Sequence, residues 1–102
     1  MNNMEVCRGD IVLSRNGRDK GKYLFVAEAD GDFLVLLDGK SRKVERPKRK
    51  KAKHCIFLAR EDSRVAEKLR SGERINNSDI RKALAAFRNH AEAGQTETGE
   101  VE

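Results

Sequence analysis

Tryptophan is absent from the 102 residues, and tyrosine and proline occur once each. The only cysteines are Cys7 and Cys55, and the only histidines are His54 and His90, so the sequence lacks the paired, closely spaced ligands of a zinc finger or ribbon. We expect two half-buried thiols in a reducing, cytoplasmic setting, because the first residues carry charges and lack the apolar core of a signal peptide. No apolar run approaches the ~20 residues that span a bilayer, which argues against a membrane role.

Signatures of catalysis and of cofactor binding are also lacking. Neither cysteine, nor any serine, has a histidine and an orienting acid at a suggestive spacing. The glycines do not form a strand-to-helix phosphate loop. Three acids, Asp30, Asp32 and Asp38, lie beside glycines, where turn conformation explains them better than a metal ion does. The sequence therefore predicts a non-enzymatic protein with no catalytic residue, no metal and no cofactor.

Charge, in contrast, is abundant and uneven along the chain. The sequence has 22 Lys or Arg and 17 Asp or Glu, for a formal net charge of +5. Residues 40–53 contain nine cations and one acid, Glu45, whereas the last twelve residues contain four glutamates and no cation. So dense a cluster of like charge favours a polyanionic partner that neutralises it. The alternative is a solvated, charged edge strand that prevents pairing with another sheet.

The apolar residues predict a single small domain that is mainly β-structure. With 37% hydrophobic residues, the chain can bury only a small core. Short apolar and β-branched segments predict strands over residues 11–14, 23–29, 33–37 and 54–59. The pairs Asp30-Gly31 and Asp38-Gly39 follow the second and third segments, and we expect type I′ hairpin turns there.

A fourth strand is predicted over residues 40–46. It is mostly charged and is ended by Pro47, which has no amide hydrogen to donate, so it is expected to be an edge strand. A basic loop over residues 48–53 then leads to the last strand. Five strands of this length fit a small five-stranded SH3-like barrel over residues 1–60.

Two helices are expected after the barrel, because strands 23–29 and 33–37 are apolar on both faces and their outer face needs a cover. The first, over residues 63–71, is stopped by Gly72. The second, over residues 77–90, is capped by Asn76 or Asn77. Its apolar positions are Ile80, Ala83, Leu84, Phe87 and Ala91. Its other face carries Arg81, Lys82 and Arg88.

The chain is thus divided into a barrel over residues 1–60, a helical extension packed on the barrel over residues 61–91, and an acidic tail over residues 92–102. The tail has no apolar periodicity, and we expect it to be disordered.

One segment, residues 9–29, combines an apolar strand, a basic loop containing Gly17 and Gly21, and a second apolar strand. This pattern resembles the KOW motif, in which the loop glycine matched by Gly21 is the most constrained position. The similarity extends over residues 9–58 to bacterial KOW-domain RNA-binding proteins and to the KOW-barrel large-subunit ribosomal proteins of archaea and eukaryotes. The matching positions are Gly17-Arg18-Asp19-Lys20-Gly21, Asp38-Gly39, Arg42-Lys43, Pro47 and Lys53-His54.

The resemblance implies a cytoplasmic, monomeric, ribosomal protein-like factor in translation that binds RNA, such as rRNA or a ribosomal particle. A stable ribosomal component and a transient, ribosome-associated factor are both compatible with it. The alternative function is a protein-interaction KOW module that docks on an acidic partner of the transcription or translation machinery.

The candidate RNA-binding residues come from the 15–22 loop and from the cationic cluster, which we expect to lie at the same end of the barrel. They are Arg15, Arg18, Lys20, Gly21, Lys22, Arg42, Lys43, Arg46, Lys48, Arg49, Lys50, Lys51, Lys53 and His54. Lysines act as point charges, so the 48–53 segment is expected to anchor the RNA backbone. Arginines can grip phosphate or stack on a base, so Arg15, Arg18, Arg42 and Arg49 are expected to read RNA shape or an unpaired base.

For two ring side chains, Tyr23 and His54, the sequence is compatible with two alternative roles each. Tyr23 is either part of the barrel wall or an RNA-facing ring, and His54 either donates to a phosphate or caps the barrel edge. Because aromatic residues make up only 5% of the chain, structured RNA is a better expected ligand than a single strand read by base stacking.

Overall fold

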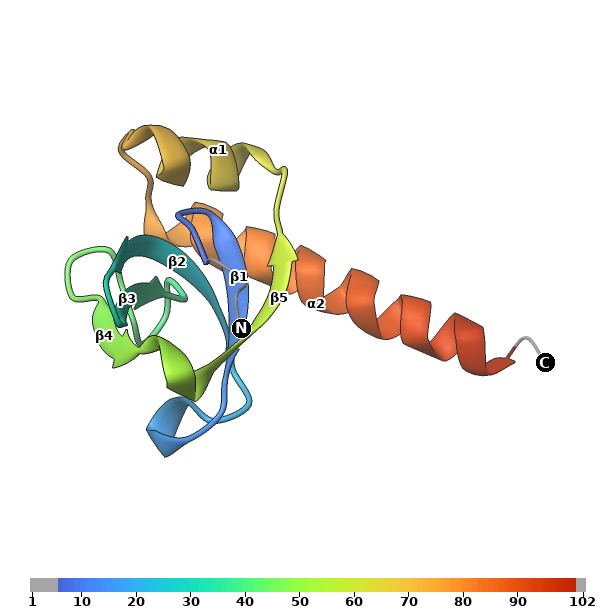
Figure 1. The fold of residues 1–102 in the computed structure, drawn as a ribbon. Coiled ribbons are helices and arrows are strands. Elements are labelled where there is room, and N and C mark those ends of the chain that lie inside the picture. The colour runs from blue at the N-terminus through green and yellow to red at the C-terminus, as the bar shows by residue number, and fades with distance from the viewer. Residues whose placement is uncertain (1–5, 101–102) are drawn as a thin grey trace.

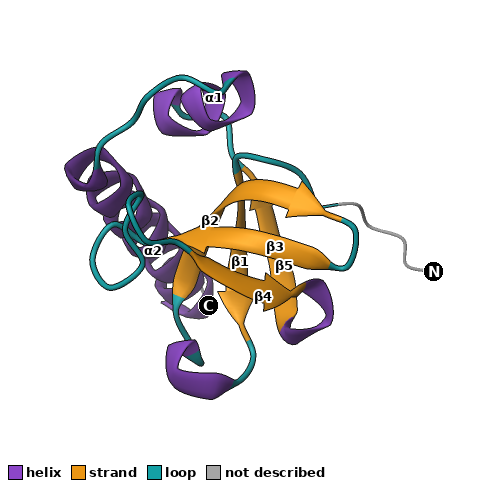
Figure 2. Cartoon of the chain, turned by 90° about the vertical axis from the view of Figure 1, so that its left-hand side faces the viewer, coloured by secondary structure: helices purple, strands orange, loops and turns teal. Residues whose placement is uncertain are grey.

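The computed structural model describes residues 6–100, with side chains as far as residue 91. Its elements are β1 (Asp10–Ser14), the 3₁₀ turn η1 (Gly17–Asp19), β2 (Tyr23–Asp30), β3 (Phe33–Leu37), β4 (Lys48–Lys51), the 3₁₀ turn η2 (Ala52–His54), β5 (Cys55–Arg60), α1 (Arg64–Ser71) and α2 (Asn77–Glu100). All five strands form one antiparallel sheet in the order β4-β3-β2-β1-β5. The two edge strands, β4 and β5, are not hydrogen-bonded to each other, so the sheet is curled but open (Figures 1 and 2).

Alternation along β1, β2 and β3 divides the core into two clusters, one on each face of the sheet. The inner cluster consists of Val12, Leu24, Val26, Leu34 and Leu36. The outer cluster joins Ile11, Phe25 and Leu37 of the sheet to Ala66, Leu69, Ile80 and Leu84 of the helices. All of these side chains are at most 7% exposed. The prediction that helices cover the outer face of a doubly apolar sheet is confirmed.

The β2–β3 hairpin has the predicted position but a different turn. Asp30 pairs with Phe33, so Gly31 and Asp32 are the two central residues. Gly31 has a φ of 60°, whereas Asp32 has a negative φ. A type I′ turn needs positive φ at both central positions, so the expectation of type I′ is wrong here, and one positive φ at the first position is the type II′ pattern.

The predicted fourth strand over residues 40–46 is wrong, because strand β4 starts only after Pro47. The Asp38 carboxylate accepts the amide hydrogens of Lys40 and Arg42 at 2.8 and 2.7 Å. These amides are therefore not available to pair with β3, and residues 38–47 form a loop instead of a hairpin at Asp38-Gly39. Pro47 stands immediately before the strand, a position that needs no amide hydrogen. The segment predicted as a basic loop over residues 48–53 is β4 followed by η2.

Both helices begin as the sequence predicts. The Ser63 hydroxyl accepts the amide hydrogen of Ala66 at 3.2 Å, and Gly72 ends α1 in the left-handed conformation with a φ of 78°. At the start of α2, the Asn76 side chain accepts the amide hydrogen of Asp79 at 2.8 Å.

The far end of α2 differs from the prediction. The helix continues to Glu100, past the sheet, where a disordered tail was expected from residue 92 (Figure 1). The absence of apolar periodicity tests only for a buried face. Six of the ten residues 91–100 are alanine, glutamate or glutamine, which have good helix propensity, and the other four are two glycines and two threonines, which do not. The last two residues of the predicted tail, 101–102, lie outside the described residues.

Candidate nucleic-acid interface

The β1–β2 connection, residues 15–22, is held in one conformation by its backbone. The amide of Gly21 donates to the Ser14 carbonyl at 2.9 Å, and the amide of Ser14 donates to the Lys22 carbonyl at 3.1 Å. Gly21 has a φ of 85°, in the left-handed region, and a Cβ at this position would meet nothing within 4 Å. Glycine is thus required here by the backbone conformation and not by crowding.

This connection lies against the segment that joins β4 to β5. Lys50 Nζ donates to the Asn16 carbonyl at 3.1 Å, and the Asn16 amide nitrogen lies 2.9 Å from His54 Nδ1. The backbone amide of Arg15 also donates to the His54 carbonyl at 2.8 Å. Figure 1 shows η1 and η2 at the same end of the sheet. The two segments meet at one end, as the sequence predicts, and His54 has the structural role of joining them.

Three side chains of the connection, Arg15, Arg18 and Lys20, are exposed, and so is Lys53 of η2. We call these four residues together with Lys50 the cationic face. Lys50 is half-buried and reaches the connection along the inner side of the sheet.

Asp19, the acid within the connection, is buried and paired with Arg42, so it is not exposed to solvent beside the cations of the connection. Its side chain is only 2% exposed, and Arg42 contacts it with Nη2 at 2.9 Å from Oδ2 and Nε at 3.3 Å from both oxygens. Lys22 Nζ lies 3.7 Å from Oδ1. Burial by itself raises the pKa of Asp19, but the hydrogen bonds and charge of Arg42, with the charges of Lys22 and Lys50, outweigh it and lower that pKa below its usual value.

Arg42 therefore has a different role from the one expected. Its guanidinium is committed to Asp19 and is 25% exposed, so it fastens the 38–47 loop to the β1–β2 connection instead of reading a base. An acid inside an otherwise basic loop was the signal in the sequence for this internal ion pair.

Strand β4 divides the cations of the predicted lysine-rich loop between the two faces of the sheet. Lys48 and Lys50 pair with Leu36 and Leu34, so they share the inner face with the core. Inward-pointing charges on an edge strand discourage pairing with another sheet, which supports the charged-edge interpretation for these two lysines.

The other two cations of β4 share the outer face with Phe33. The guanidinium of Arg49 lies 4.2 Å from the centre of the Phe33 ring, and Lys51 Nζ lies 5.9 Å from it. Both distances are within cation–π range, and the side chains of Arg49 and Lys51 are exposed. The four residues 48–51 therefore do not act as one solvated loop.

Lys43 and Arg46 lie on a separate turn. The two residues form an isolated β-bridge, and the turn is attached to the start of α2, because Asn77 accepts the amide hydrogen of Val44 at 2.9 Å and donates to Glu45 at 3.0 Å. The hydrogen bond from Asn77 lowers the pKa of Glu45. Figure 1 shows this turn beside α2 and away from η1, so the structure does not bring Lys43 and Arg46 to the cationic face.

No protein-family model matches the chain, and no curated protein is significantly similar to it. The KOW resemblance therefore depends on the sequence positions that carry it.

Arg81 and Arg88, expected on the other face of the second helix from its apolar positions, are exposed but border the apolar face. Arg81 Nη1 donates to the Gly39 carbonyl at 2.7 Å, and the Arg88 guanidinium lies 5.4 Å from the centre of the Tyr23 ring. Both arginines are three or four residues from the buried Leu84, a helical spacing that places them on the same side. Tyr23 also contacts the Phe87 ring edge-on at 5.6 Å, so it forms part of the wall between sheet and helix.

The thiols differ from each other. Cys7 is exposed, which contradicts the expected half-burial, whereas Cys55 is half-buried as expected, and burial raises the pKa of its thiol. Within residues 6–91, the side chains form no group of three or more His, Cys, Asp or Glu that could hold a metal ion. Across the described chain, neither helix is apolar enough over sufficient length to cross a membrane.

Proposed function

We propose that this protein is a non-enzymatic RNA-binding protein of the KOW type that binds structured RNA, such as rRNA in a ribosomal particle, through the cationic face. The observation that carries the proposal is the contact of Lys50 and His54 with Asn16, which joins two basic segments, distant in sequence, into one surface. A surface with several cations close together attracts phosphates because binding releases the counterions of the nucleic acid.

The strand order supports an SH3-like barrel as the finer description of the fold. A meander from β1 to β4, with β5 returning beside β1, brings the β1–β2 connection and the start of β5 to one end of the sheet. In a KOW barrel this connection is the motif loop, and here it presents Arg15 and Arg18.

The restrained backbone of the connection gives these two arginines a selective role. Gly21 and Ser14 hold the loop by hydrogen bonds, and the Asp19–Arg42 ion pair fastens it from below. A guanidinium on a fixed loop is held in fewer orientations than one on a mobile loop, so it can distinguish RNA shapes.

The first test is the affinity for RNA as a function of salt. For about five phosphate contacts, one for each cation of the cationic face, a log–log slope of magnitude about 3.5 is expected on a single strand. Retained binding with a slope near zero would contradict a mechanism based on phosphate contacts.

The second test compares two double variants of equal charge. Arg15→Gln with Arg18→Gln should weaken RNA binding about tenfold or more and change the ranking among RNAs, given a cost of about 1.4 kcal/mol for each factor of ten. Arg64→Gln with Lys82→Gln removes two exposed cations of the helices and should change affinity by less than about twofold. Equal reductions in both variants would show that net charge, and not the cationic face, sets the affinity.

One observation favours the second candidate, a protein-interaction module. Ile56, on the edge strand β5, is 43% exposed and is an apolar contact that an RNA backbone does not need. If an acidic protein is the partner, Ile56→Ser should abolish association with ribosomal particles and leave binding to purified RNA unchanged.

A further inference from the structure

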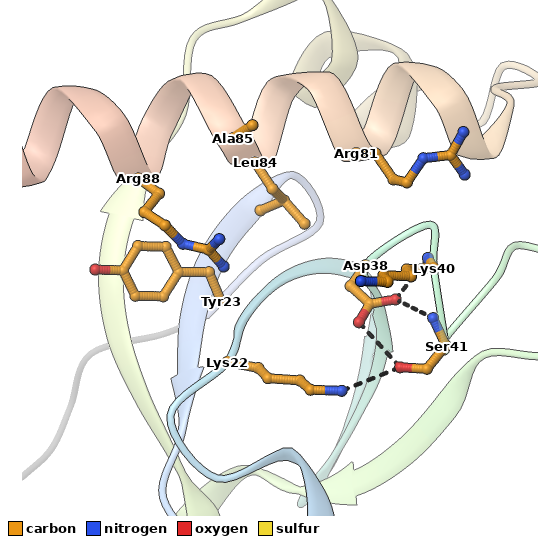
Figure 3. Close-up of a pocket in the computed structure, with 9 residues that line it drawn as sticks. All are labelled: Lys22, Tyr23, Asp38, Lys40, Ser41, Arg81, Leu84, Ala85 and Arg88. Carbon is orange, nitrogen blue, oxygen red and sulfur yellow. Dashed lines mark hydrogen bonds between the residues drawn. The ribbon is translucent and has the colours of Figure 1, made fainter.

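A cleft of about 350 Å³ lies between α2 and the end of the sheet where β2 begins (Figure 3). Tyr23 and Leu84 form its apolar wall. Cations from three separate parts of the chain line it, namely Lys22, Lys40, Arg81 and Arg88. None of the last three belongs to the cationic face or to the RNA-binding residues expected from the sequence.

The cleft carries a net positive charge because four cations line it and only one acid, Asp38, does. The two oxygens of Asp38 accept the amide hydrogens of Lys40 and Arg42 and the hydroxyl of Ser41 at 2.7 to 3.2 Å. These bonds are internal to the loop, so the carboxylate is held by its own loop. Lys22 is shared with Ser41 and Arg81 with Gly39, which leaves Lys40 and Arg88 for a ligand (Figure 3). An anion is therefore the ligand that this chemistry favours.

The shape of the cleft is fixed before any ligand binds. Arg81 fastens the loop to α2 through the Gly39 carbonyl, and Gly39 lies so close to the helix that an added Cβ would clash with the Asn77 carbonyl oxygen. On the sheet side, Lys22 Nζ donates to the Ser41 hydroxyl at 3.2 Å. Arg88 lies over the Tyr23 ring, which restricts its guanidinium. Preorganisation of this kind lowers the entropy cost of binding.

The cleft is continuous with the cationic face. Lys22 ends the β1–β2 connection and also lines the cleft, and the Asp19–Arg42 ion pair joins that connection to the loop that forms the opposite rim. Lys22 thus links the β1–β2 connection to the cleft, and it marks the route by which a polyanion bound at Arg15 and Arg18 would reach Lys40 and Arg88.

We propose that this cleft binds a backbone phosphate of the same RNA, held by Lys40 and Arg88. The proposal rests on the proposed function and extends its surface from the β1–β2 connection to α2. Lys40 supplies a mobile point charge, whereas Arg88 supplies a guanidinium whose direction is set by Tyr23. Arg81 is a positioning residue, since its guanidinium is used on the Gly39 carbonyl.

The test variant is Lys40→Gln with Arg88→Gln, and the matched control is Arg64→Gln with Lys82→Gln, which removes the same charge from exposed positions outside the cleft. The cleft variant should bind RNA about five- to tenfold more weakly, and its salt slope on a single strand should fall by about 0.7 for each phosphate that the protein no longer neutralises. The control should keep the wild-type slope. Because Arg88 also packs on Tyr23, the single variant Lys40→Gln, at an exposed position, is measured alongside and should lower the slope without changing the melting temperature.

A titration with 5′-AMP and with inorganic phosphate, followed by NMR at Ser41 and Tyr23, distinguishes an RNA backbone phosphate from a free mononucleotide or phosphate ion as the ligand of the cleft. We expect both probes to bind at least a hundredfold more weakly than an RNA oligonucleotide. Binding of 5′-AMP as tight as that of RNA would overturn the proposal, because the cleft would then be a mononucleotide site.

Failure of this inference can be distinguished from failure of the proposed function. If the wild-type protein binds RNA and the Arg15/Arg18 variant binds it more weakly, but the cleft variants match their control, only the cleft assignment is overturned. If the wild-type protein has no salt-dependent RNA affinity, both are overturned.

Discussion

Replacing Arg42 by Gln tests the internal ion pair on which the geometry of the cationic face depends. Asp19 is 2% exposed and accepts hydrogen bonds from Nε and Nη2 of Arg42. Breaking a buried pair by removing one partner costs about 3–5 kcal/mol. The cost here should lie below that, at about 2–3 kcal/mol, because Arg42 is 25% exposed and Lys22 remains 3.7 Å from Asp19.

The same variant should change the dependence of stability on pH. In the wild-type protein the folded pKa of Asp19 is below its usual value, so its contribution to stability is fully present above the usual pKa and is lost as the pH falls through the lower, folded pKa. Without Arg42, burial is opposed only by the lysines, and the folded pKa should rise. The loss of stability on acidification should then be smaller than in the wild type, because the folded and unfolded pKa values of Asp19 lie closer together.

Urea unfolding between pH 2 and pH 7, with the pKa of Asp19 followed by NMR, measures both effects. Arg46→Gln is the control, since it removes an exposed arginine from the neighbouring turn with the same change of charge. If Arg42→Gln and Arg46→Gln have equal free energies of unfolding, and the pKa of Asp19 is the same in both, the reasoning about the ion pair is refuted.

Three further predictions concern the frame around the site. Gly39→Ala should lower the free energy of unfolding by more than about 2 kcal/mol, because the φ of 77° is combined with a clash at the Asn77 carbonyl. Gly21→Ala, with a φ of 85° in open space, should lower it by only about 1 kcal/mol, and equal effects of the two variants in thermal unfolding would contradict this distinction. Ser63→Ala should cost about 1 kcal/mol through loss of the cap on α1, and an unchanged melting temperature would show that the hydroxyl bond to Ala66 contributes nothing. Alkylation at pH 8 should modify Cys7 before Cys55, since Cys7 is exposed and burial raises the pKa of the Cys55 thiol; preferential labelling of Cys55, detected by mass spectrometry, would contradict that order.

The elements that the sequence predicts correctly are those whose signal is local. The apolar alternation of β1, β2 and β3, the serine cap of α1 and the glycine after it are each contained within one segment. Strand β4 has no such signal: its four residues are all cations, and it is a strand because β3 lies beside it and because Asp38 holds the preceding amides in a loop. Local propensity contains neither of these tertiary causes, and the strand is therefore predicted too early in the chain.

The candidate site also has one part that the sequence could predict and one part that depends on tertiary contacts. That the β1–β2 connection meets the start of β5 could be predicted, because the end of β1 lies beside the start of a last strand that returns antiparallel to it, as the Ser14–Cys55 pair shows here. The cleft could not be, because it depends on where α2 crosses the 38–47 loop, and that crossing is decided by the close approach of Gly39 to Asn77. The helical spacing of Arg81, Leu84 and Arg88 indicates a common side but not what lies opposite.

The two-sided core also has a consequence for the protein while it is being synthesised. The strands leave the ribosome before the helices, so Ile11, Phe25 and Leu37 are not fully covered until both α1 and α2 have followed. The roughly 30 residues from the end of β5 to Ala91 take about 2–6 s at about 5–20 residues per second. During that interval the nascent sheet shows an apolar outer surface beside two unpaired edges, and its own lysines on β4 protect one of them.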